Sequence, residues 1–255
     1  MGMLLRRVTK HVKDQNWLAV GIDFAIVVIG VFIGIQVANF NDVQKEQQSA
    51  DAYVERLDEE FDIIRQRLDD GLRAYQRSIS GIDLLLNAHR QRRETPDAVL
   101  PDEQTLGLAA YRVTSGSVPA GAPAAFKELI ASGTLETIED QQLRQALFAY
   151  DEFAAIARDG WKSIREEQHG SANLILSFID LRASERMSER SNETLDGIDI
   201  VGFDQLGFLQ SDEAPGALSV LLRSQVNQYT LMERQLELAN DVETLLAEFS
   251  ARSRS

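Results

Sequence analysis

One carboxylate of this chain lies inside an apolar stretch, where a charged group is unusual. Asp23 is the only acidic or basic residue between Trp17 and Ala38. A charge in the middle of a membrane span costs about 2.5–3.5 kcal/mol on insertion scales, so such a residue is a functional candidate by default. Two plainer explanations stay open: Asp23 reaches the nearby aqueous interface, or it is protonated in a contact between helices. A role in an accessory subunit of a proton-coupled membrane complex is a further alternative.

The other residues that could support chemistry do not form a complete site. Glu166 and His169 have the Glu-x-x-His spacing of di-iron helix bundles, which need a second such pair and two further Glu. His89, the other histidine after the apolar stretch, has Leu86 three positions before it. The sequence has no Cys, no phosphate-binding glycine loop and no hydroxyl nucleophile with a base close by in sequence. We therefore expect no catalytic residue, no metal and no cofactor, and a protein that is not an enzyme.

The apolar stretch itself predicts a membrane helix. Residues 17–38 number 22 and would extend about 33 Å as a helix, close to the thickness of a bilayer core. A buried core helix is one alternative, but the stretch is apolar on every face. A cleaved signal peptide is another, but its apolar part would have about 7–15 residues and end in a small-x-small site. Ile35 lies three positions before the end of the stretch, so a retained signal anchor at 17–39 fits better.

Charge is distributed unevenly on the two sides of this stretch. The whole chain has a net charge of −14, of which residues 1–41 contribute +2 and residues 42–255 contribute −16. Four cations precede the span, whereas Lys45 is the only one within about 15 residues after it, which predicts a cytoplasmic amino terminus. In a bacterium, the short basic head (1–16) would be cytoplasmic. The acidic body (40–255) would be periplasmic, held at the inner membrane, and would repel nucleic acid.

Asp23 is predicted to share one helix face with Gly30, Gly34 and Asn41. At about 100° per residue, all four lie within about 20° of one line along the helix. Small residues four positions apart let two helices approach closely, and a polar group on that face then contacts a partner instead of lipid. We expect a membrane-helix contact at these residues, in the simplest case a homodimer. Chance spacing of Gly, which is common in spans, is the alternative.

The body has the periodicity of long helices. Apolar residues at steps of three and four predict a helix over about 42–93, with a heptad seam that could extend the dimer contact. The seam residues are Val54, Leu57, Phe61, Ile64, Leu68, Leu72, Tyr75, Ile79, Ile82 and Leu86. Long helices are also expected from a cap at Asp140 to about Ala183, and over about 217–250.

Shorter elements are expected between the long helices. A helix over about 103–112 and another over 123–132, closed by Gly133, lie between Pro-rich stretches. Segments 94–122 and 184–216 are otherwise expected to be irregular, with at most one short strand at 198–203. Amphipathic helices of this length are not stable alone in water, so the expected fold class is all-α: a single membrane helix followed by an antiparallel bundle.

Two stretches carry a family resemblance. The first contains Asp23, Ile26-Val27-Val28, Gly30, Gly34, Gln36 and Asn39-Phe40-Asn41, and the second contains Lys127 to Leu135, Ile138 and Leu143-Arg144. Both resemble motifs of an uncharacterised bacterial domain-of-unknown-function family with one N-terminal transmembrane helix. Glu, Ala and Trp are usual there at the positions of Asp23, Gly34 and Phe40. The resemblance implies anchoring and a helical extracytoplasmic domain, and it brings no known activity.

Together these observations predict an interaction or scaffold module of the bacterial envelope that acts by binding. Its expected partners are the lipid bilayer and other envelope membrane proteins. A ligand-binding sensor ectodomain is the alternative, although a head of 16 residues is too short to hold an output domain. A hydrolase is disfavoured because no nucleophile can be paired with a base.

Overall fold

The computed structural model describes residues 17–183 and 198–253, and it divides the chain into two compact units, residues 1–52 and 53–255. Helix α2 (Trp17–Glu94) has residues in both units. The elements after it are α3 (Glu103–Arg112), α4 (Ala124–Ser132), η1 (Leu135–Thr137), α5 (Gln141–Leu176), β1 (Ile179–Ala183), β2 (Ile198–Phe203), α6 (Gln205–Gln210) and α7 (Ala214–Ser253).

Unit 1 is described only as the first part of α2. Every side chain from Phe24 to Val37 in this helix is exposed. Within the described residues, no helix is both long enough and apolar enough to cross a bilayer. The side chains of residues 17–23 and 38–39, which belong to the predicted span, lie outside the described residues. The membrane helix therefore stays a prediction.

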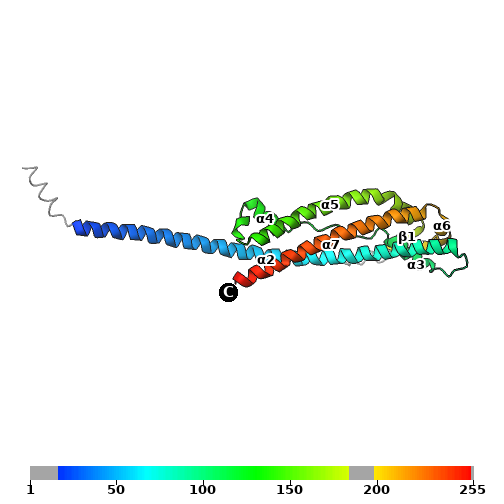
Figure 1. Cartoon of the computed structure of the whole chain (residues 1–255), viewed down its shortest axis with the longest axis horizontal. Coiled ribbons are helices and arrows are strands. Elements are labelled where there is room, and N and C mark those ends of the chain that lie inside the picture. Colours follow the sequence, from blue (N-terminus) through cyan, green and yellow to red (C-terminus); the bar gives the residue numbers. More distant parts are fainter. Residues whose placement is uncertain (1–16, 184–197, 254–255) are drawn as a thin grey trace, which may run out of the picture. The chain divides into compact units, whose positions relative to one another are not determined.

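Unit 2 confirms the all-α fold class and a packed helical bundle. From Tyr53 onward α2 lies beside α5 and α7 (Figure 1). Cross-helix hydrogen bonds give the directions: Arg65–Glu243 and Tyr75–Gln228 join α2 to α7, and Tyr150–Gln235 and Glu167–Arg223 join α5 to α7. Both α2 and α5 therefore run antiparallel to α7 and parallel to each other. Two of the three helix pairs are thus antiparallel, and α2 and α5 point the same way because the long connection from Thr95 to Asp140 returns the chain before α5 begins.

Local capping chemistry defines the start of α3 and α5 and the end of α4, and the caps at Asp140 and Gly133 are those that the sequence predicted. The Asp102 carboxylate accepts a hydrogen bond from the Thr105 N–H at 2.7 Å and so begins α3. The Asp140 carboxylate accepts from two backbone N–H groups at 2.9 and 3.0 Å and begins α5. Gly133 has φ +71°, the left-handed conformation that closes α4.

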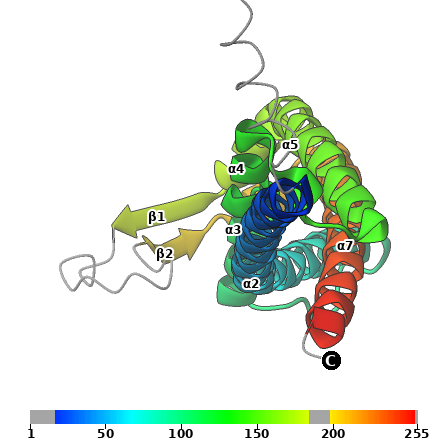
Figure 2. The same cartoon turned by 90° about the vertical axis from the view of Figure 1, so that its left-hand side faces the viewer.

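Two predictions about the later elements are wrong. Helix α5 ends at Leu176, not near Ala183, because residues 179–183 form a strand that pairs antiparallel with 198–203. This two-stranded sheet extends away from the helices in Figure 2. The predicted irregular segment 184–216 also contains α6, whose Asp204 cap accepts from the Gly207 N–H at 2.9 Å. Residues 184–197 lie outside the described residues.

The buried face of α2 also differs from the predicted seam in its second half. The seam residues from Val54 to Tyr75 are buried as expected. Beyond Tyr75, Ile82 is buried as expected, but Ser78 and Leu85 are buried in place of Ile79 and Leu86, which are only half-buried. A straight helix turns slightly relative to a heptad repeat, so the face that meets its neighbours moves by one residue.

Candidate functional site

The four residues predicted to form a membrane-helix contact are only partly described. A Cβ added to Gly30 or Gly34 would meet nothing within 4 Å, so this face of α2 is open in a single chain. The side chains of Asp23 and Asn41 lie outside the described residues. Among the described residues nothing contacts this face at Gly30 or Gly34, and the proposed membrane-helix contact stays a prediction.

The interior of unit 2 is divided by a layer of buried polar side chains. On α2 one apolar cluster ends at Tyr75 and a second begins at Ile82, and the buried Ser78 lies between them. The corresponding polar residues are Gln168 on α5 and Gln225 and Gln228 on α7, each at most 5% exposed. Buried amide groups are costly unless they are hydrogen-bonded, so the layer needs a structural reason.

One such reason is the backbone of residues 113–122, which turns at 113–114 and then forms neither helix nor strand; we call it the extended stretch. Buried donors from the helices meet its carbonyl oxygens. Gln225 donates to Val113 O at 2.8 Å, Tyr75 donates to Ser117 O at 2.8 Å, and Gln235 donates to Ala120 O at 2.6 Å. We call these three side chains the carbonyl clamp. They satisfy acceptors that would otherwise be buried without a partner.

The carbonyl clamp does not follow from apolar periodicity. Steps of three and four along residues 217–250 predict Val226, Tyr229 and Leu236 on the buried face of α7, but Val226 is 43% exposed and the other two are only partly buried. Gln225, Gln228 and Gln235 are buried instead, at spacings of three and seven that fit one helix face. This spacing is the signal that could have identified them, since amides at core positions must have partners.

Both buried phenols stay protonated at neutral pH: Tyr75 donates to Ser117 O, and Tyr150 accepts from the Gln235 amide. Burial raises the pKa of Tyr75 to about 12 and also raises the pKa of Tyr150. Gly116 lets the extended stretch approach closely, because a Cβ there would lie 2.5 Å from the Tyr75 ring. Part of this stretch is therefore packed in the core, with Val113 and Ala120 buried, whereas Val118 is 55% exposed.

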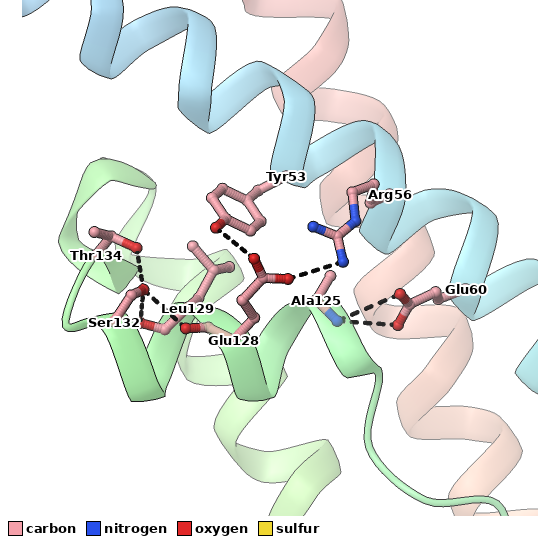
Figure 3. A network of polar contacts seen from close by, with 8 residues as sticks. All are labelled: Tyr53, Arg56, Glu60, Ala125, Glu128, Leu129, Ser132 and Thr134. Carbon is pink, nitrogen blue, oxygen red and sulfur yellow. Dashed lines mark hydrogen bonds and ion pairs between the residues drawn. The ribbon is translucent and has the colours of Figure 1, made fainter.

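Helix α4 is held against α2 by a polar network (Figure 3). The Glu128 carboxylate accepts from the Tyr53 hydroxyl at 3.1 Å and from the Arg56 guanidinium at 2.9 Å. The hydrogen bond from Arg56, followed by the one from Tyr53, lowers the pKa of Glu128. Across the same contact, Glu60 accepts from the Ala125 N–H at 3.2 and 3.3 Å, which satisfies a free donor in the first turn of α4.

This network explains the second of the two sequence motifs. Glu128 contacts α2, Leu129 is fully buried, and Ser132 donates to the Glu128 carbonyl at 2.8 Å. Gly133 ends the helix, and Ile138 is fully buried in the same apolar cluster. The motif from Lys127 to Leu135 is therefore a docking element that joins the returning chain to α2.

Comparison with known protein families, curated proteins and solved structures finds no match.

The histidines do not extend the Glu-x-x-His pair. Glu166 and His169 are exposed on α5. His89 is buried, its Nε2 lies 2.9 Å from Ser211 O, and its ring packs edge-on against Phe208. Across the described ranges, no group of three or more His, Cys, Asp or Glu side chains could hold a metal ion.

An open groove of about 420 Å³ lies between α2 and α3 in unit 2. We call it the arginine groove. Its lining residues are Arg73, Gln76, Arg77, Ser80, Gly81, Leu84, Thr105, Leu108, Ala109 and Arg112. A Cβ on Gly81 would lie 3.1 Å from Ala109 O, so the backbones of the two helices approach closely at its floor. None of the predicted site residues lines this groove.

Proposed function

We propose that this chain is a single-pass membrane protein of the bacterial envelope, and that unit 2 acts by binding other molecules. The observation that carries the proposal is the exposure of residues 24–37. None of these residues is charged, and ten large apolar side chains among them are each 48–70% exposed. The proposed orientation has the amino terminus in the cytoplasm and unit 2 in the periplasm, from the excess of cations before the span.

The cost of leaving this surface in water supports the proposal. Burying one such side chain is worth about 1.5–3 kcal/mol, so ten half-exposed side chains forgo on the order of 10 kcal/mol. That sum is comparable to the whole stability of a typical domain, about 5–15 kcal/mol. A lipid bilayer would cover the entire circumference of the helix, which matches apolar side chains on every face.

The arginine groove favours binding over a purely structural role for unit 2. Guanidinium groups around an open groove that also has apolar residues in its lining are typical of sites that hold a ligand. The scaffold and sensor hypotheses both require such a surface. The groove is therefore the feature that an experiment on ligands can address.

We expect carbonate-washed membranes to retain the full chain, and two lysines in the apolar run to release it. Each lysine in the middle of a span costs about 2.5–3.5 kcal/mol, so Ile29→Lys with Phe32→Lys removes most of the insertion free energy. The matched control is Ile63→Lys with Val99→Lys, which places the same charges at exposed apolar positions of unit 2. The measurement is the fraction of the chain in the pellet after an alkaline wash.

The same membranes test the orientation. A reporter that is active only in the periplasm should be active when it is fused after Ser255. Extraction of the wild-type chain by carbonate would contradict the anchoring. If both double variants left the membrane pellet to the same extent, the release would be due to added charge alone and not to the apolar run. An active cytoplasmic reporter at that position would contradict the orientation.

A further inference from the structure

The arginine groove differs in charge from the rest of the chain. Acidic residues outnumber basic ones by 40 to 26 over the whole sequence, yet the ten residues that line the groove include three arginines and no acid. A low-dielectric concave surface with one sign of charge concentrates its field and attracts ions of the opposite sign. The groove is thus a cationic region on an otherwise acidic protein.

In the part of the chain that the structure describes, two of the three guanidinium groups form no ion pair with a carboxylate. Arg73 forms an ion pair with Asp70 at 2.5 Å. Within the described residues, Arg77 and Arg112 form no ion pair and donate no side-chain hydrogen bond. They approach the groove from α2 and α3 respectively, so their donors can bind one oxyanion from two sides. Guanidinium groups bind carboxylate and phosphate through paired hydrogen bonds.

The remainder of the lining is suited to an organic group. Leu84, Leu108 and Ala109 provide apolar surface, and Leu108 is 38% exposed although it is a large hydrophobic residue. Ser80 and Thr105 add hydroxyl groups to the lining. The volume of about 420 Å³ lies in the range of about 300–1,000 Å³ that is usual for small-molecule sites.

We propose that the arginine groove binds a small organic anion, in which a phosphate or carboxylate group contacts Arg77 and Arg112 and an apolar or aromatic group contacts Leu84 and Leu108. This inference rests on the proposed binding role of unit 2 and is independent of membrane anchoring. The side chains from α3 are positioned by its Asp102 cap and by the close approach of Gly81 to Ala109.

The test is isothermal titration calorimetry on the full chain in a non-ionic detergent, with phenyl phosphate and benzoate as organic anions. Inorganic phosphate and phenol each carry only one half of the proposed ligand. We expect one of the organic anions to bind with a Kd below about 1 mM, and each half to bind about tenfold more weakly or not at all. Tighter binding of phenyl phosphate would indicate that the groove recognises phosphate, and tighter binding of benzoate would indicate that it recognises carboxylate.

The variant Arg77→Gln with Arg112→Gln is expected to weaken binding by about tenfold or more, since hydrogen bonds to charged groups are lost. Arg67→Gln with Arg90→Gln removes the same charge from exposed positions of α2 outside the groove and should leave binding within about twofold. Leu108→Asn should weaken binding of the organic anion and leave binding of inorganic phosphate unchanged.

Three results would overturn the inference. They are the absence of binding by both organic anions, equal weakening by the two arginine double variants, and binding of inorganic phosphate as tight as that of phenyl phosphate. None of these results bears on retention in carbonate-washed membranes, so failure of this inference and failure of the proposed anchoring are distinguishable.

Discussion

Replacing Phe61 with alanine is expected to lower the free energy of unfolding of unit 2 by about 3–5 kcal/mol. Phe61 is fully buried, and its ring meets Tyr150 edge-on with the centroids 5.0 Å apart. The substitution removes this contact and leaves a cavity between α2 and α5, the two parallel helices. The measurement is urea unfolding of the full chain in a non-ionic detergent, followed by circular dichroism.

Phe148→Ala is the matched control for this prediction. Phe148 is on the same helix as Tyr150, but its side chain is 50% exposed and contacts Phe126 edge-on at 5.4 Å. We expect the free energy of unfolding to fall by about 1 kcal/mol or less, because little apolar surface of this half-exposed side chain is buried on folding. Equal losses for the two variants would mean that the contact between α2 and α5 is not a central part of the core.

Replacing Gln235 with methionine is expected to cost about 1–3 kcal/mol, although the two side chains are similar in size. The Gln235 amide donates to Ala120 O at 2.6 Å and to the Tyr150 hydroxyl at 3.1 Å. Methionine has no donor, so the buried Ala120 carbonyl loses its partner and the extended stretch 113–122 is held less firmly. Hydrogen-exchange mass spectrometry should show faster exchange in this stretch, alongside the lower urea midpoint.

Gln145→Met is the matched control for this prediction, because it makes the same substitution at a position without a buried hydrogen bond. Gln145 is exposed on α5, and methionine there should change neither the urea midpoint nor exchange in residues 113–122 beyond experimental error. If Gln235→Met also left exchange in that stretch unchanged, the carbonyl clamp would not be what holds it. A uniform rise in hydrogen exchange over all of unit 2 would also contradict the prediction that Gln235 acts locally on residues 113–122.

The sequence predicts those elements that are determined by interactions between residues a few positions apart. The bounds of α3, the Asp140 cap of α5 and the left-handed Gly133 all follow from hydrogen bonds or backbone preferences between near neighbours. The apolar period of α2 from Val54 to Tyr75 is also local, since helix geometry alone puts those residues on one face. The apolar run before it likewise needs no tertiary information to be recognised.

Three other features depend on which segments meet. Periodicity favoured Ile79 over Ser78 and Val226 over Gln225, because a pattern of apolar residues has no information about the carbonyl groups that a distant stretch of chain brings to a helix. The parallel packing of α2 and α5 depends on a connection that crosses the length of the bundle. In the arginine groove, Arg77 and Arg112 are separated by 35 positions, and only the packing of α3 on α2 places them around one space. Local interactions thus determined the helices, and tertiary packing decided which polar side chains are buried and which cations share a groove.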